Sequence, residues 1–189
     1  VWSDSQRWLN GGDQMDAVMN YQFTRACIAF FTGGDLDHDE LRRNSLYPPP
    51  ASDAETFRRE IERLLEIYHP NVTAVQLNLL DSHDMARFTT IARGDTSALR
   101  LATLFQMTYP GAPSIYYGDE IGLAGGHDPF NRAAFPWHKP ESWDCALLHT
   151  FQRFIALRHA RPALRRGSFR FLLAQEGVIA YAREHKGET

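Results

Sequence analysis

Cysteine is scarce in this sequence, and a long hydrophobic run is missing. Only two of the 189 residues are cysteine, Cys27 and Cys145, and they lie far apart in helix-like stretches. Two distant cysteines do not form a disulfide framework, so we expect both to be buried, reduced thiols in a cytoplasmic protein. No apolar run approaches the roughly 20 residues that a membrane span needs. We therefore expect no membrane partner.

The sequence also has little net charge. Its 20 Lys and Arg residues nearly balance 23 Asp and Glu residues, which gives a formal net charge of -3. A balance this close to neutral argues against binding to nucleic acid or to a charged membrane surface. In contrast, 43% of the residues are hydrophobic and 12% are aromatic. This is enough apolar material for the core of a globular protein.

Residues 75–90, with the sequence VQLNLLDSHDMARFTT, are the stretch around which the rest of the chain is organised. An apolar run at 75–80 ends abruptly in a polar cluster. Period-two alternation places Asn78, Leu80, Ser82 and Asp84 on one side of a strand. This pattern is typical of a buried parallel strand whose carboxyl end opens into a site. A strand that simply ends in a polar turn is the alternative.

Two other motifs do not support the chemistry they resemble. Residues 82–84 read Ser-His-Asp, but three consecutive side chains cannot hydrogen-bond in series as nucleophile, base and orienter. Asp35, Asp37 and Asp39 fall at the first, third and fifth places of a calcium loop. Glu40 then stands where such a loop needs glycine. We therefore expect a solvated acidic loop in this region rather than a metal site.

The chain alternates between strand-like and helix-like segments. Strands are expected at 15–21, 75–80 and 113–117, and helices at 23–31, 53–68, 97–109 and 143–159. Ser52, with Glu55 three residues later, predicts a capping box for the second of these helices. This alternation indicates a parallel α/β fold. After residue 164 the pattern changes to a two-stranded hairpin, which predicts a second domain.

A long polar, glycine-rich loop runs from the strand at 113–117 to Trp137. Loops of this length in a compact domain are usually functional. Aromatic residues beside acids and an arginine suit sugar binding, because aromatic faces cover the apolar faces of sugars while charged groups bond the hydroxyls. We expect Asp119 and Glu120 to bond the backbone and the neighbouring loop, and a direct contact with substrate is the alternative. Arg87 either contacts substrate or pairs with a carboxylate.

Three segments of this sequence resemble one known family. NLLDSHDMARF and GAPSIYYGDEIGLAGGHDPFNR closely resemble the last two conserved strand ends of the alpha-amylase superfamily of retaining glycoside hydrolases. The nearest match is the branch of neopullulanase, cyclomaltodextrinase and maltogenic amylase. The segment GDQMDAVMNYQF of this chain resembles the sixth barrel strand of that branch. The similarity implies strands six to eight of an α/β (β/α)₈ TIM barrel at 1–164. The start of a β-sandwich domain is implied at 165–189.

The resemblance also implies roles for five residues. Asp84 is implied to be the carboxylate that stabilises the transition state, and His83 to bond the same sugar. Asp128 and Arg132 match a D-P-x-x-R pattern that holds a glucose unit further along the donor side. Trp2 matches the tryptophan of a G-E-hydrophobic-W motif and is implied to bind substrate.

The sequence departs from the branch at three positions. Phe130 and Asn131 stand where an acid and a cysteine are more common, and Met85 replaces the usual threonine.

The resemblance implies a retaining α-glycosidase that acts on cyclomaltodextrins, maltooligosaccharides or pullulan, without a cofactor or metal. The implied enzyme cleaves α-1,4 or α-1,6 bonds. The family's nucleophile and acid/base come from strands four and five, which would precede Val1, so we expect the isolated chain to be inactive. We also expect it to self-associate through its open strand edges. The alternative is a non-catalytic carbohydrate-binding or interaction module derived from the barrel. A glutamate directly before Val1 would favour the enzyme.

Overall fold

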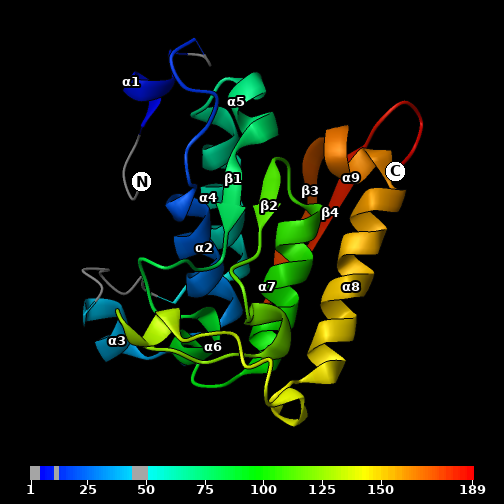
Figure 1. Cartoon of the computed structure of the whole chain (residues 1–189). Helices are drawn as coiled ribbons and strands as arrows, with labels where there is room; N and C mark the ends of the chain where they lie inside the picture. Colours follow the sequence, from blue (N-terminus) through cyan, green and yellow to red (C-terminus); the bar gives the residue numbers. More distant parts are fainter. Residues whose placement is uncertain (1–4, 11–12, 44–50) are drawn as a thin grey trace.

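The computed structural model describes residues 5–10, 13–43 and 51–189 (Figure 1). Three of its short helices are of the 3₁₀ type and are labelled η2 to η4. The elements in chain order are α1 (Gln6–Leu9), α2 (Tyr21–Phe31), α3 (His38–Arg43), α4 (Ala54–Glu66), α5 (Pro70–Val75), β1 (Leu77–Leu79), α6 (Phe88–Ile91), α7 (Thr96–Thr108), β2 (Ala112–Ser114), η2 (Asp119–Ile121), η3 (Phe130–Arg132), η4 (Pro140–Ser142), α8 (Cys145–Ala160), α9 (Pro162–Arg166), β3 (Ser168–Gln175) and β4 (Val178–Glu184).

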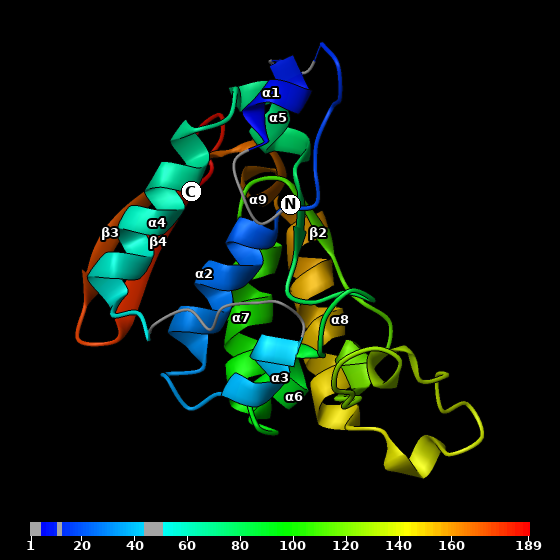
Figure 2. The ribbon, with the colours of Figure 1, turned by 90° about the vertical axis from the view of Figure 1, so that its left-hand side faces the viewer.

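The elements form layers that Figures 1 and 2 show from two sides. Strands β1 and β2 pair in parallel on one side of the molecule, and helices α2 and α7 lie behind them. Helix α4 and the antiparallel hairpin β3–β4 form the far side. Helix α8 packs along α7. The parallel pair and its helices confirm the α/β class that the strand–helix alternation predicts.

The predicted strand at 15–21 is wrong over most of its length. Within the described part of the chain, this segment contributes one isolated parallel bridge, between Met19 and Leu77. Tyr21 already begins helix α2, because the Asn20 side chain accepts a hydrogen bond from the Phe23 amide and caps the helix. Met19 still lies beside β1, which in turn lies beside β2. The three predicted strand segments therefore follow one another in space.

Phe105 on helix α7 joins the layers in one aromatic core. Its ring lies 5.8 Å from that of Phe23 on α2 and 5.1 Å from that of Phe57 on α4. The rings of Phe169 and Tyr181 on the hairpin lie 6.2 and 5.5 Å from it. Aromatic rings at these separations add favourable edge and stacking contacts to the burial of apolar area. The hairpin predicted after residue 164 is confirmed, whereas its assignment to a separate domain stays a prediction.

Local capping chemistry overrides two of the sequence predictions. The segment expected to be an acidic loop contains helix α3, because Asp37 Oδ1 accepts hydrogen bonds at 3.0 Å from the amides of Asp39 and Glu40. Helix α4 is capped by Asp53, whose carboxylate accepts from the Thr56 amide at 2.7 Å. The predicted Ser52 capping box is therefore wrong by one residue.

The two cysteines lie in different environments. Cys27 is fully buried in α2, and burial raises the pKa of its thiol well above the usual value. Cys145 is exposed, so the prediction of a buried thiol is wrong there. It is the first residue of α8, and the buried face of that helix begins only at Leu147. Across residues 5–10, 13–43 and 51–189, no helix is long and apolar enough to span a membrane.

Gly111 is a position where the fold admits no side chain. Its φ is 105°, and a Cβ atom there would lie 2.6 Å from Asn78 Nδ2 and 2.7 Å from the Gln76 carbonyl oxygen. Gly111 thereby allows the turn before β2 to approach β1. Gly94 also has a positive φ of 87°, but nothing lies within 4 Å of a Cβ built on it. Substitution of Gly94 would therefore cause backbone strain alone, whereas substitution of Gly111 would cause both strain and a steric clash.

We predict that Gly111→Ala destabilises the fold more than Gly94→Ala. The left-handed backbone alone costs about 1–2 kcal/mol for a non-glycine residue. At Gly111 the contact with β1 adds about 1–3 kcal/mol, because backbone atoms must shift. Thermal unfolding of both variants measures the difference. Equal losses of stability would show that the approach of the turn to β1 is not tight.

Candidate active site

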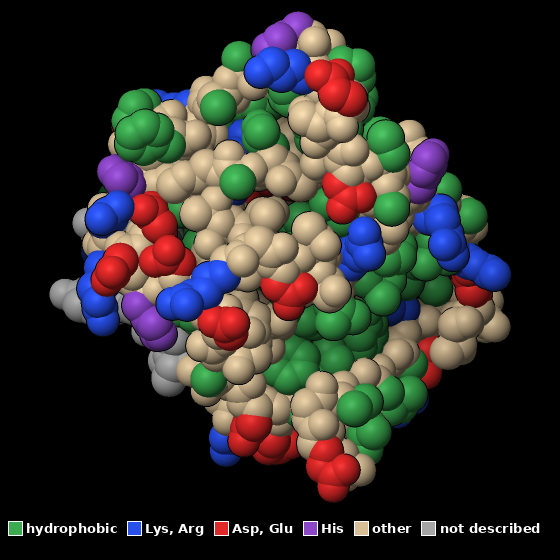
Figure 3. All heavy atoms as spheres, turned by 90° about the horizontal axis from the view of Figure 1, so that it is seen from below, with side chains coloured by type: hydrophobic (Ala, Val, Ile, Leu, Met, Phe, Trp, Pro, Cys, Tyr) green, Lys and Arg blue, Asp and Glu red, His purple; other side chains and the backbone are tan. Residues whose placement is uncertain are grey.

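The polar cluster after β1 lies where the strand leaves the core. Asn78 and Leu79 are fully buried, and Ser82 is only 4% exposed. The side chains of His83 and Asp84 are then 56% and 55% exposed. The chain therefore stays buried as far as Ser82 and becomes exposed at His83 and Asp84. Figure 3 shows the face onto which β1 and β2 end, where acidic and basic side chains lie close to one another around exposed hydrophobic ones.

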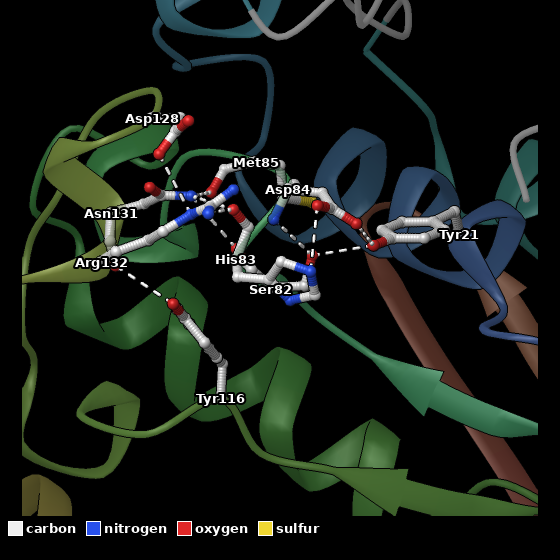
Figure 4. Close-up of polar contacts among 9 residues, drawn as sticks. All are labelled: Tyr21, Ser82, His83, Asp84, Met85, Tyr116, Asp128, Asn131 and Arg132. Carbon is white, nitrogen blue, oxygen red and sulfur yellow. Dashed lines mark hydrogen bonds and ion pairs between the residues drawn. The ribbon is translucent and has the colours of Figure 1, made fainter.

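The Asp84 carboxylate is held by two neighbouring side chains (Figure 4). Tyr21 donates its hydroxyl to Asp84 Oδ2 at 3.2 Å, and His83 Nε2 lies 3.1 Å from Oδ1. Burial, opposed by a hydrogen bond with Ser82 and aided by the Asp84 charge, raises the Tyr21 pKa. Tyr21 is therefore a neutral hydroxyl donor at physiological pH. The sequence pattern did not single out Tyr21, which reaches the site from the first turn of α2.

The D-P-x-x-R residues lie directly against this cluster. Arg132 Nε lies 3.1 Å from Asp128 Oδ1 and donates to the His83 carbonyl oxygen at 3.0 Å. Figure 4 shows the pair beside the loop that carries Asp84. The structure thus brings together four of the five predicted site residues. Trp2 lies outside the described residues.

Asn131 is a second residue whose part in the site the sequence did not reveal. The sequence shows Asn131 only as a departure from the family pattern. In the structure it is fully buried and lies against the loop that carries Asp84. Its side-chain amide donates to the carbonyl oxygens of His83 at 2.9 Å and Met85 at 2.7 Å. These two carbonyls flank Asp84.

A buried ionic cluster of Arg87, Asp119 and Asp81 lies next to the site. The Arg87 guanidinium is completely buried, with its central carbon 4.5 Å from the Tyr116 ring centroid and 4.9 Å from that of Tyr117. Its Nη1 lies 3.2 Å from Asp119 Oδ1, which confirms pairing of Arg87 with a carboxylate. Asp119 therefore bonds a side chain rather than backbone. Glu120 accepts from the Gly118 amide at 2.7 Å, as expected of a backbone contact.

Two carboxyl groups share this buried cluster. Burial, followed by the charge of Asp81 and a hydrogen bond to it, raises the pKa of Asp119 well above its usual value. The Arg87 charge opposes this shift but does not cancel it. Burial also raises the Asp81 pKa, although the Phe88 amide donates to Asp81 Oδ2 at 2.6 Å. Of the two carboxyls, Asp119 has the pKa that is raised further above its usual value.

The exposed groups suit a ligand that is rich in hydroxyls. A carboxylate accepts hydrogen bonds from hydroxyls, whereas a guanidinium donates to them. The described residues contain no group of three or more His, Cys, Asp or Glu side chains that could hold a metal ion.

The chain belongs to the alpha-amylase family, a family of glycoside hydrolases, because the model of the alpha-amylase catalytic domain matches residues 2–144. A cyclomaltodextrinase from a Bacillus species is 44% identical over 191 residues, covering all of this chain and 31% of that protein. Neopullulanase 2 of Thermoactinomyces vulgaris is 40% identical over 182 residues, covering 96% of this chain and 28% of that protein. The chain thus lies in the predicted branch and spans about a third of the length of these relatives.

Solved structures agree with the family assignment. Ttha1563 from Thermus thermophilus superposes with a TM-score of 0.92 at 39% identity, covering 97% of this chain and 38% of that one. The native debranching enzyme of Nostoc punctiforme gives a TM-score of 0.91 at 42% identity, covering 98% of this chain and 37% of that one. The fold is therefore that of the alpha-amylase catalytic domain, a TIM-barrel fold.

We predict that replacing Asp119 with asparagine becomes more favourable to stability as the pH rises. A carboxyl whose pKa is raised on folding contributes most below the unfolded value of about 4, and that contribution is lost as the pH rises through the folded pKa. Asp119→Asn removes this loss but keeps an oxygen that can accept from Arg87. The melting temperature of the variant relative to the wild type should therefore increase between about pH 4 and pH 8.

The control for this experiment is Asp39→Asn, which removes an exposed carboxylate paired with Arg42. Its melting temperature relative to the wild type should change little over the same range. A difference for Asp119→Asn that stays constant with pH would show that Asp119 is ionised in the folded protein.

Proposed function

We propose that this chain is part of a retaining α-glycosidase that hydrolyses α-1,4 or α-1,6 bonds in cyclomaltodextrins, maltooligosaccharides or pullulan. The observation that carries the proposal is the Asp84 carboxylate, exposed at the end of β1 and held by Tyr21 and His83. The names of the relatives agree with it, since they include a cyclomaltodextrinase and a neopullulanase.

In this proposal Asp84 stabilises the transition state. Retaining glycosidases pass through an oxocarbenium-like state, and hydrogen bonds to the sugar hydroxyls strengthen there. The Tyr21 hydroxyl and the His83 ring orient the carboxylate before substrate binds, so little reorganisation is needed during the reaction. His83, with a half-exposed ring, contacts the same sugar.

Asp128 and Arg132 hold a neighbouring glucose unit on the donor side. Arg132 uses its Nε for its contacts with both Asp128 and the His83 carbonyl oxygen. The arginine side chain is 47% exposed, so its terminal amino groups are placed to donate to sugar hydroxyls. This subsite binds substrate remote from the broken bond.

The remaining catalytic groups belong to strands outside this chain. Retention requires a nucleophile and an acid/base whose carboxyls lie about 5–5.5 Å apart. We propose that Met19, β1 and β2 mark strands six, seven and eight of the barrel and that residues 165–189 begin a β-sandwich. The strand order Met19, β1, β2 supports this numbering. The isolated chain is then inactive, because a lone carboxylate cannot serve at both ends of one bond.

Asp84→Asn should lower kcat in the longest natural protein that contains this chain. The change removes the charge of a group that acts mainly on the transition state, so kcat should fall by at least roughly 10²–10³-fold. KM should change far less, because ground-state binding loses little. Steady-state kinetics on cyclomaltodextrin measure both constants, with Asp39→Asn as the matched control. A near-normal kcat for Asp84→Asn would refute the proposed function.

Arg132→Ala should mainly raise KM for longer substrates. Its guanidinium contacts a sugar remote from the reacting centre, so its loss weakens binding in the ground state and the transition state alike. KM for maltotriose and for longer maltooligosaccharides should therefore diverge in the variant. Equal effects on short and long substrates would contradict the placement of this subsite.

The isolated 189-residue chain should self-associate. Three consecutive strands of a barrel have two open edges, whereas a closed barrel has none. Within the described part of the chain, β2 pairs on one side only, with β1. Sedimentation at micromolar concentration should therefore give a mass above the 21.6 kDa of one chain. A cooperatively unfolding monomer would show that the open edges are tolerated.

A further inference from the structure

The backbone that carries Asp84 belongs to no helix or strand. Strand β1 ends at Leu79 and helix α6 begins at Phe88, so the residues between them lack a regular hydrogen-bond ladder. Within this loop, Ser82 accepts hydrogen bonds from the amides of Asp84 at 3.1 Å and Met85 at 3.3 Å. These local bonds satisfy amide groups but leave the carbonyls of the loop to be fixed by another element.

Asn131 supplies the donors for those carbonyls. Its Nδ2 donates to the carbonyl oxygens of His83 and Met85 at 2.9 and 2.7 Å, one on each side of Asp84. A third, longer contact of 3.5 Å reaches the Ser82 carbonyl. Of the two end atoms of the Asn131 side chain, only the nitrogen can make these bonds, because the carbonyl oxygen does not donate. In Figure 4 the Asn131 side chain points toward the segment that carries Asp84.

Asn131 is itself held firmly in place. It lies in the short helix η3, and Tyr116 donates its hydroxyl to the Asn131 carbonyl oxygen at 3.4 Å. The η3 backbone is packed so closely on Gly125 that a Cβ there would lie 2.5 Å from the Phe130 carbonyl oxygen. Gly125 in turn accepts a hydrogen bond from the Arg87 amide at 2.9 Å. The donor is therefore fixed relative to the end of the same loop.

We propose that Asn131 is a positioning residue for the reaction: through the His83 and Met85 carbonyls it sets the backbone from which Asp84 reaches the substrate. The inference rests on the proposed function and extends it, because Asn131 acts through the backbone carbonyl oxygens that its side chain bonds and not through the substrate. A misplacement of about 1 Å in a catalytic group can cost about 100-fold in rate. The branch-typical cysteine at this position also carries a donor, although a weak one.

The test compares Asn131→Leu with Asn131→Cys in the longest natural protein that contains this chain. Leucine has the branched shape of asparagine but larger ends and no donor, whereas cysteine has nearly the volume of asparagine and keeps an S–H donor. If donation matters, Asn131→Leu should lower kcat on cyclomaltodextrin about 10–100-fold with little change in KM. Asn131→Cys should recover a large part of that loss. Asn131→Ala, which has no donor and cannot overpack the site, should lose kcat as Asn131→Leu does; if only packing matters, it should lose stability but keep kcat within about twofold.

Gln106→Leu is the matched control. Gln106 is also buried, and its side-chain amide donates to two carbonyl oxygens, of Asn78 at 3.0 Å and of Ser114 at 2.8 Å. It lies on α7 and bonds β1 and β2 rather than the loop of Asp84. Gln106→Leu should lower the melting temperature but leave kcat of the folded enzyme within about twofold, as expected for a stabilising group without a positioning role.

Each outcome decides between two interpretations. Equal losses of kcat in Asn131→Leu and Gln106→Leu, or a loss of stability alone in Asn131→Leu, would overturn the positioning role. If Asn131→Leu does not fold, Asn131→Ser and Asn131→Ala make the same comparison with and without a hydroxyl donor. An active Asp84→Asn enzyme would instead refute the proposed function, and with it the need to position Asp84.

Discussion

The buried guanidinium of Arg87 is the interaction on which the geometry of the site depends. It donates to the Tyr117 carbonyl at 2.7 Å, pairs with Asp119 and lies against two tyrosine rings. An unpaired charge in the protein interior is strongly destabilising, so these partners must stay in place once the fold has formed. Arg87 follows β1 and its partners follow β2. The ends of the two strands are therefore locked to each other.

The fixed ends of β1 and β2 place the long loop that follows Asp119 against the loop that carries Asp84. After Asp119 the chain passes Gly125, which accepts from the Arg87 amide, and then reaches η3. There Asn131 and Arg132 both donate to the carbonyl oxygen of His83. One backbone atom thus links the loop that carries Asp84 with the segment proposed to hold a neighbouring sugar. The loop that carries Asp84 is thus fixed through its main-chain carbonyl oxygens by side-chain donors from η3.

The far side of the molecule is joined to the site layer through helix α7. Arg158 on α8 and Arg183 on β4 donate to carbonyl oxygens at the carboxyl end of α7. Burial lowers the Arg183 pKa to about 10, yet the group remains a cation at physiological pH. A cation near the last carbonyls of a helix also interacts favourably with the helix dipole. The hairpin is therefore attached to the parallel layer by both aromatic packing and buried hydrogen bonds.

The sequence determined the parts of this protein that local patterns encode. Helices α7 and α8 lie within a few residues of their predicted ranges, because apolar residues at helical spacing mark the buried face. The polar residues at the end of β1, including Asp84, were found because the apolar run ends abruptly there. The D-P-x-x-R pattern likewise led to Asp128 and Arg132. These features are contiguous in sequence and carry their own signal.

Only the tertiary structure decided which distant groups complete the site. Tyr21 lies 63 residues from Asp84 and Asn131 lies 46 residues from Met85, so no local pattern connects them. The exposure of Cys145 and the raised pKa of Asp119 depend in the same way on what packs around each residue. A hydrogen bond or a buried charge requires its partner in space, and the partner's position is set by the fold. Local sequence specifies which groups are present, whereas long-range packing specifies which of them meet.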